Sequence, residues 1–187
     1  MRIVSTVVLV LALLAAPPLA SGAVADQNDP RLDRLFQRLE SADGPREARF
    51  YASRIWAIWY SHPSGSIEAL MRAGRAALQD DDLKGALIAF DDAVRKAPNF
   101  AEAWNARATA RYMMGNYERA LADVRRTLTL EPRHFGALAG RGLCHIKLDN
   151  LERAAEAFEA SLAIHPHQPG VEGNLRMVRK RLDNLDL

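Results

Sequence analysis

The 187 residues are 49% hydrophobic and 26% charged, and 25 Lys and Arg oppose 23 Asp and Glu for a formal net charge of +2. This balance is typical of a globular domain and excludes a disordered or fibrous chain. No basic stripe stands out, so we expect no nucleic-acid partner. The sole cysteine, Cys144, cannot form an internal disulfide, so packing alone must stabilise the fold.

Residues 1–25 have the order of a secretory signal. Arg2 is followed by an apolar run over residues 3–16 and then by Ala23-Val24-Ala25, a small-x-small cleavage site before Asp26. As a helix the run would span roughly 20 Å, which is short of the ~30 Å hydrocarbon core of a bilayer. We therefore predict a cleaved signal peptide and a periplasmic protein, with an uncleaved anchor as the alternative. No membrane contact is expected after cleavage.

Residues 26–66 predict a helical hairpin. A first helix begins at Asp29-Pro30, Gly44-Pro45 breaks it, and a second helix runs to about Ser61. We expect this hairpin to stack on the repeat that follows it.

The second helix of this hairpin is unusually aromatic. Its large apolar residues are Phe50, Tyr51, Ile55, Trp56, Ile58, Trp59 and Tyr60. They exceed what one packing face needs. Either both faces are covered, by the first repeat and by the preceding helix, or some of the aromatic residues form a docking or dimerisation patch. The candidate patch residues are Tyr51, Ile55, Trp56 and Trp59.

Residues 67–100, 101–134 and 135–168 are three consecutive blocks of equal length, with Pro98, Pro132 and Pro166 at the same position near each end. Position 8 holds Gly74, Ala108 and Gly142, position 20 holds Ala86, Ala120 and Ala154, and position 24 holds Phe90, Val124 and Phe158. The small residues predict close contact between two helices in each block, because a larger side chain would push them apart. Proline then ends the second helix, so the blocks predict an all-α solenoid.

The blocks resemble the tetratricopeptide repeat, whose period of about 34 residues and W, L-G, Y, A, F, P pattern they follow. The second block matches best, through Trp104, Ala108, Gly115, Tyr117, Ala120 and Pro132. Departures from the pattern include Arg107, Arg111 and Arg141, which we expect to lie over the second helix of a repeat, with Asp123 as a partner. The aromatic "RIWAIW" and the "EPRHFGALAGRG" joint also resemble short exported tetratricopeptide proteins of alphaproteobacteria.

The last segment, residues 169–187, predicts an amphipathic capping helix. Its apolar stripe is Val171, Leu175, Val178 and Leu182. We interpret its basic residues as a solvated face rather than as a site for lipid or polymer.

No residue set predicts catalysis, a metal or a cofactor. Cys144 occupies a helix position typical of a small buried hydrophobe. The histidines near Pro166 lack a carboxylate or thiolate companion, and residues 80–82 lack the glycine and glutamate of a calcium loop. We therefore expect a binding protein and not an enzyme.

The resemblance implies that the first helix of each repeat lines a concave groove. The predicted groove residues are Glu68, Met71, Arg75, Leu78, Gln79, Glu102, Asn105, Thr109, Tyr112, Met113, Gly136, Ala139, Leu143, Ile146 and Lys147. The chaperone-tail binders of the family clamp a terminal carboxylate with Lys and Asn at positions held here by Met71 and Arg75, so that clamp is not carried over. A peptide with apolar anchors would suit this groove.

The sequence thus predicts a periplasmic scaffold or adaptor that binds proteins and, by analogy alone, supports assembly or integrity of the cell envelope. One alternative is an accessory subunit that regulates a cell-wall enzyme or another periplasmic enzyme. A second alternative is a structural protein that self-associates through the helix of Trp56 and Trp59. Both a free groove and a groove filled by the N-terminal segment agree with the sequence.

Overall fold

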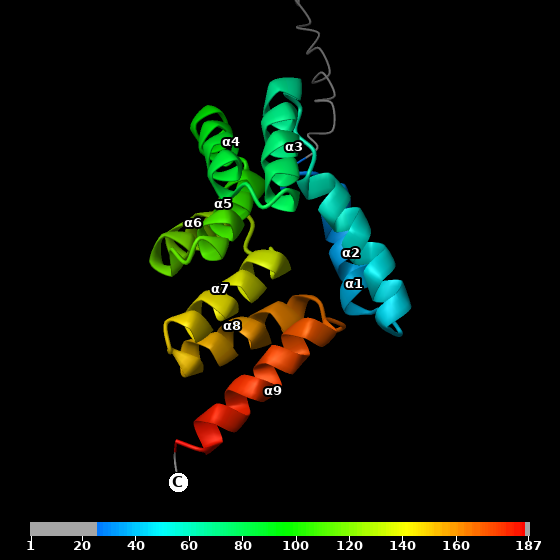
Figure 1. Cartoon of the computed structure of the whole chain (residues 1–187). Coiled ribbons are helices and arrows are strands. Elements are labelled where there is room, and N and C mark those ends of the chain that lie inside the picture. The colour runs from blue at the N-terminus through cyan, green and yellow to red at the C-terminus, as the bar shows by residue number, and fades with distance from the viewer. Residues whose placement is uncertain (1–25, 186–187) are drawn as a thin grey trace, which may run out of the picture.

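The computed structural model describes residues 26–185, and every regular element in that range is an α-helix (Figure 1). The helices are α1 (Arg31–Glu40), α2 (Pro45–Trp59), α3 (Gly65–Gln79), α4 (Leu83–Lys96), α5 (Ala101–Met113), α6 (Tyr117–Leu130), α7 (Phe135–Lys147), α8 (Leu151–Ile164) and α9 (Pro169–Asp183). The predicted all-α solenoid is confirmed. The predicted signal peptide lies outside the described residues.

The pairs α3–α4, α5–α6 and α7–α8 follow one another along the array, and α9 packs on α8 at its end (Figure 1). The turn inside each pair carries one residue with positive φ at the same repeat position: Asp81 (59°), Gly115 (78°) and Asp149 (57°). Glycine and aspartate tolerate this left-handed conformation better than most residues do. The shared turn geometry therefore explains the residue types between the helices.

Matched small and large side chains set the distance between the helices of each pair. A Cβ added at Gly74 would lie 2.4 Å from the Phe90 ring, and one added at Gly142 would lie 2.4 Å from the Phe158 ring. In the second repeat, where the small residue is alanine, the partner is the smaller Val124. The predicted close approach of the two helices is confirmed. In each repeat a smaller residue at one of the two positions is matched by a larger residue at the other, or the reverse, so that the two side chains fill the space between the helices.

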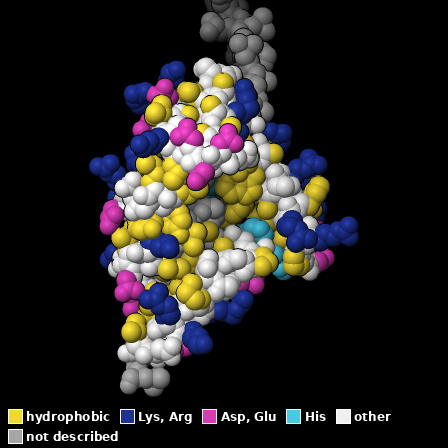
Figure 2. Space-filling view, in the orientation of Figure 1, with side chains coloured by type: hydrophobic (Ala, Val, Ile, Leu, Met, Phe, Trp, Pro, Cys, Tyr) yellow, Lys and Arg dark blue, Asp and Glu magenta, His cyan; other side chains and the backbone are white. Residues whose placement is uncertain are grey.

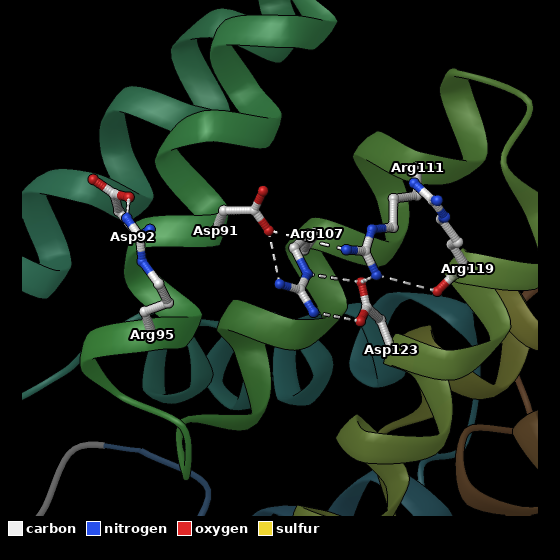
Figure 3. Close-up of polar contacts among 7 residues, drawn as sticks. All are labelled: Asp91, Asp92, Arg95, Arg107, Arg111, Arg119 and Asp123. Atoms are coloured by element: carbon white, nitrogen blue, oxygen red, sulfur yellow. Dashed lines mark hydrogen bonds and ion pairs between the residues drawn. The ribbon is translucent and has the colours of Figure 1, made fainter.

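A buried ionic network joins the first repeat to the second (Figure 3). Arg107 of α5 donates to both carboxylate oxygens of Asp123 of α6 (2.7 and 3.0 Å) and to Asp91 of α4 (2.7 Å). Arg111 lies one turn further along α5, 2.8 Å from Asp123 Oδ2. Because Asp123 is only 1% exposed, these partners offset the desolvation of its carboxylate. The predicted placement of Arg107 and Arg111 is confirmed.

The C-terminal helix caps the array as predicted. Leu175 and Val178 are buried in one cluster with Leu151 and Phe158 of α8, while Val171 and Leu182 pack at its edge. The exposed basic side chains make surface ion pairs, such as Arg179 with Glu159 (2.8 Å).

The N-terminal hairpin does not extend the solenoid as predicted, but lies along its side (Figure 1). Its core, which contains Phe36, Ile55 and Trp59, continues into Phe135 and Ile164 of the third repeat. The expectation that it stacks on the first repeat is therefore wrong for its main packing.

Three loops between helix pairs hold the N-terminal segment in place. Gln27 donates to the main-chain oxygen of Asn99 (2.6 Å), Arg133 donates to Asp33 (2.7 Å), and His167 Nε2 donates to the main-chain oxygen of Ala42 (3.2 Å). Asn99, Arg133 and His167 occupy the same position of successive repeats. Stacked helices are about 8–10 Å apart. The segment that contains α1 and its flanking residues therefore meets one such loop of each repeat in turn.

Candidate functional site

The C-terminal end of α2 lies on the concave side of the array. Trp59 stacks on His134 with ring centroids 4.0 Å apart and an interplanar angle of 9°. Trp56 lies so close to Gly136 that a Cβ added there would be 2.7 Å from its indole ring. The Arg75 guanidinium covers the Tyr60 ring at 4.9 Å. The chain thus fills part of its own groove.

A buried polar pair supports these aromatic contacts. The main-chain N–H of Ala137 donates to Nδ1 of His134 (3.1 Å), so the proton of the neutral ring is on Nε2, which donates to Glu102 (3.1 Å). The Asn105 side-chain amide also donates to the Glu102 carboxylate (3.0 Å), and Glu102 is only 4% exposed. These bonds join the starts of α5 and α7 and fix the ring on which Trp59 stacks.

The rest of the concave side keeps an open cavity of about 200 Å³ between α5 and α7. Its lining residues are Asn105, Ala108, Thr109, Tyr112, Val124, Gly136, Ala139, Gly140, Leu143 and Cys144. Figure 2 shows a hollow on this face, bordered by hydrophobic side chains.

The lining chemistry of this cavity is apolar with two polar groups. Tyr112 and Leu143 supply apolar surface, while Gly136, Ala139 and Gly140 leave room for a ligand. The Asn105 amide and the Thr109 hydroxyl lie at the same cavity, and such groups orient a bound peptide. The space and its lining suit one apolar side chain with nearby main-chain polar groups.

The structure brings only some of the predicted groove residues together. Asn105, Thr109, Tyr112, Leu143, Gly136 and Ala139 line the cavity. Met71 is fully buried, Leu78 packs on the core of the first repeat, and Ile146 packs on the core beneath α9. Met113, Gln79 and Lys147 are exposed, Arg75 covers Tyr60, and Glu68 accepts a hydrogen bond from the main-chain N–H of His62 (3.2 Å).

The residues of the candidate docking patch pack mostly inside the chain. Ile55 is 0% and Trp59 1% exposed, and Trp56 packs against His134 and Phe135. Tyr51 is half-buried. The aromatic helix is therefore not a free patch, because the third repeat covers the face that the sequence analysis assigned either to the first repeat or to a docking patch.

Sequence reasoning missed Ala108, Val124, Gly140 and Cys144 as lining residues and Glu102 with His134 as a pair. The repeat pattern assigns Ala108 and Val124 only to helix packing, although their contact also closes the bottom of the cavity. The pair joins residues of two different repeats, and no spacing rule inside one repeat indicates it.

Among the described residues the sole cysteine is buried and no metal-ligating cluster forms. Cys144 is 1% exposed, and burial raises the pKa of its thiol to about 11, so it stays protonated at neutral pH. The prediction that it is a small buried hydrophobe is confirmed. Within residues 26–185, no group of three or more metal-ligating side chains converges, and no helix is both long and apolar enough to span a membrane.

Comparisons with known proteins agree with this architecture. Residues 105–169 match the family described as tetratricopeptide repeat. A TPR repeat-containing protein of Rhizobium etli is 39% identical over 110 residues, which cover 59% of this chain and 54% of the relative. The chain thus spans about half the length of that relative.

Solved structures match the same fold. The first TPR domain of Spaghetti (RPAP3), bound to an HSP90 peptide, aligns with a TM-score of 0.63 and 20% identity over 64% of this chain and 95% of that domain. The Yersinia enterocolitica chaperone SycD, in complex with a peptide of the translocator YopD, aligns with a TM-score of 0.59 and 14% identity over 63% of this chain and 95% of SycD. At these identities the likeness concerns the fold alone.

Proposed function

We propose that this chain, as a member of the tetratricopeptide repeat family, is a scaffold. Its protein partner binds in the cavity between α5 and α7. This fold is typical of proteins that mediate protein–protein interaction. The observation that carries the proposal is the open apolar cavity of about 200 Å³ on a concave side that α2 otherwise partly fills. The partner inserts an apolar side chain there and pairs its main chain with Asn105 and Thr109.

Two fold relatives support a peptide as the partner. The RPAP3 domain is bound to an HSP90 peptide, and SycD is bound to a peptide of YopD. A carboxylate clamp of the chaperone-tail type is not supported here, because Met71 is buried and Arg75 covers Tyr60. The anchor of the peptide is therefore apolar and internal, and not a charged chain end.

The proposal extends to the location of the protein. We place it in the periplasm, where its binding supports assembly or integrity of the cell envelope. The signal-like order of residues 1–25 supports export. Cell fractionation with mass spectrometry of the mature N-terminus tests this: a periplasmic chain that begins at Asp26 supports it, and an intact cytosolic chain contradicts it.

Photo-crosslinking in cells tests the binding site. A photoreactive residue at Tyr112 should yield a discrete set of adducts with envelope proteins, identified by mass spectrometry. The matched control is the same probe at Ile88 of α4, which is 66% exposed and lies outside the cavity. Equal adducts from both positions would argue against the cavity.

Purified partners then allow a quantitative test. Tyr112→Ala combined with Leu143→Ala should weaken binding about tenfold or more, because both side chains line the cavity and a buried apolar contact contributes about 1–3 kcal/mol. Unchanged affinity for every crosslinked partner would contradict the assignment. One enzyme that co-purifies in fixed stoichiometry would narrow the function to that of an accessory subunit.

A further inference from the structure

A second recessed surface lies between α1 and α2. It is a cavity of about 680 Å³ whose lining includes Arg34, Leu35, Arg38, Phe50, Arg54 and Ile58. It shares no residue with the cavity between α5 and α7. A ligand bound here would therefore be independent of the function proposed above.

This second cavity faces away from the repeats. On α2 it is lined by Phe50, Arg54 and Ala57, which recur every three to four residues and so share one stripe of the helix. Trp59, which packs on His134, lies on the opposite stripe of α2 by the same period. The array therefore covers one side of the hairpin and leaves the other side to solvent.

The charges at this cavity are one-sided. Asp29 pairs with Arg31 (2.6 Å), Asp33 pairs with Arg133 (2.7 Å), and Glu47 accepts a hydrogen bond from the main-chain N–H of Asp43 (3.0 Å). These three acids therefore have partners of their own, and no acid is among the residues that line the cavity.

Three of the four arginines that line the cavity are left without acids, and the fourth, Arg31, pairs with Asp29. Arg34, Arg38 and Arg54 form no ion pair with an acid among residues 26–185. The Arg54 guanidinium instead lies 5.0 Å from the Phe50 ring centroid. In Figure 2, Lys and Arg side chains gather along the outer edge of the hairpin. A recess with one sign of charge attracts ligands of the opposite sign.

We propose that the cavity between α1 and α2 binds an acidic, amphipathic helical segment of a partner protein. Carboxylates of the segment pair with Arg34, Arg38 and Arg54, and its apolar side chains pack on Leu35, Phe50 and Ile58. From Phe50 to Ile58 the α2 side of the cavity runs roughly 12 Å, which matches about two turns of a bound helix. The hairpin thereby gives the scaffold a second docking point.

The shape of the cavity favours a peptide over a membrane surface. Ile58 is only 7% exposed and lies in the recess between the two helices, where a flat bilayer does not reach. Among the large apolar lining residues only Phe50 protrudes, with 52% exposure, whereas a membrane-binding patch needs several protruding apolar side chains and a helix in a groove is held by recessed anchors and charged rims.

Fluorescence anisotropy with a synthetic probe tests the proposal on the full mature chain. The probe is a labelled helical peptide of about four turns with one leucine stripe flanked by glutamates, and the control peptide has lysine in place of each glutamate. Only the glutamate peptide should bind, and its affinity should fall as the ionic strength rises to about 0.15 M and beyond. Equal binding of both peptides would overturn the proposal.

Matched variants locate the binding. Arg34→Gln with Arg54→Gln should weaken binding about tenfold, since exposed ion pairs contribute up to about 1 kcal/mol each. Arg49→Gln with Arg125→Gln removes the same charge from exposed positions outside the cavity and should change the affinity less than twofold. Ala57→Glu, which adds an acid at an exposed lining position, should also abolish binding. Equal losses in both double variants would overturn the proposal, because the change in net charge alone would then account for them.

Two further measurements distinguish this cavity from the one between α5 and α7 and from a membrane-binding surface. Tyr112→Ala with Leu143→Ala should leave the binding of the glutamate peptide intact, and a loss there would assign the peptide to the other cavity. Co-sedimentation with vesicles of anionic phospholipid should show no binding. Vesicle binding that depends on Arg34 and Arg54, without peptide binding, would identify a membrane site and overturn the proposal.

Discussion

His165 is a neutral buried group that makes the stability of the protein depend on pH. The residue is 6% exposed, and its Nδ1 has no hydrogen-bond partner among the described residues. Burial, with the nearby His167, lowers the pKa of its imidazole to about 4. The unfolded chain takes up a proton near pH 6.5, whereas the folded chain does not until about pH 4. Unfolding is therefore favoured as the pH falls through this window.

We expect the free energy of unfolding to fall by on the order of 2 kcal/mol between about pH 7 and about pH 4 through His165. Urea unfolding at several pH values, followed by circular dichroism, measures this change. His165→Gln should remove most of it. Burial also lowers the pKa of His145, with Arg153 and Arg141 adding to the shift. His145 is present in both the wild-type chain and the variant, so its contribution cancels when the two pH profiles are compared. An identical pH profile in the variant would contradict the prediction.

At the scale of the elements, matched residues at positions 8 and 24 determine how closely the two helices of a repeat pack. Gly142→Ala should destabilise the protein by about 1–3 kcal/mol, because the new Cβ would lie 2.4 Å from the Phe158 ring. Phe158→Val should cost about 2–3 kcal/mol through the cavity that it leaves. Together the two changes reproduce the Ala108 and Val124 pair of the second repeat.

A double-mutant cycle in urea measures whether the two positions are coupled. We expect the double variant to be more stable than the sum of the single changes predicts, by at least about 1 kcal/mol. Strictly additive effects would mean that the helices shift apart to accept the alanine. The pairing in the wild-type chain would then not reflect a fixed spacing.

The elements also show how far a sequence pattern reaches. The period, the prolines, the small and large pairs and the Arg107 contact with Asp123 all follow from residues within one repeat or between neighbouring repeats. The docking of the hairpin does not, because Asp33 meets Arg133 and Ala42 meets His167 between segments that are far apart in the sequence. No local period indicates such contacts.

The same limit applies to the groove. Family geometry grouped Asn105, Thr109, Tyr112 and Leu143, and in the structure these four residues line one cavity. It could not indicate that Met71 would be buried or that Tyr60 would lie under Arg75. These outcomes depend on where α2 lies, and so on the tertiary contacts of another segment.

At the scale of the whole molecule, the hairpin acts as a strap across the array. It contacts one loop of each repeat through Gln27, Asp33 and Ala42. A solenoid without such a strap is held only by nearest-neighbour interfaces and can unfold in parts. Contacts that cross three repeats couple those parts.

We therefore expect the chain to unfold in one cooperative step. Two of the three tryptophans, Trp56 and Trp59, report on the docking of the hairpin, while far-UV circular dichroism reports on all helices, so the two urea transitions should coincide. Trp56→Ala should remove contacts with Gly136 and Phe135 and move the fluorescence transition to lower urea than the dichroism transition. Ile88→Ala, at an exposed position on α4, should leave the two transitions together. If fluorescence changed first in the wild-type chain, the hairpin would be a separately unfolding unit, and its undocking would enlarge the groove before the repeats lose their structure.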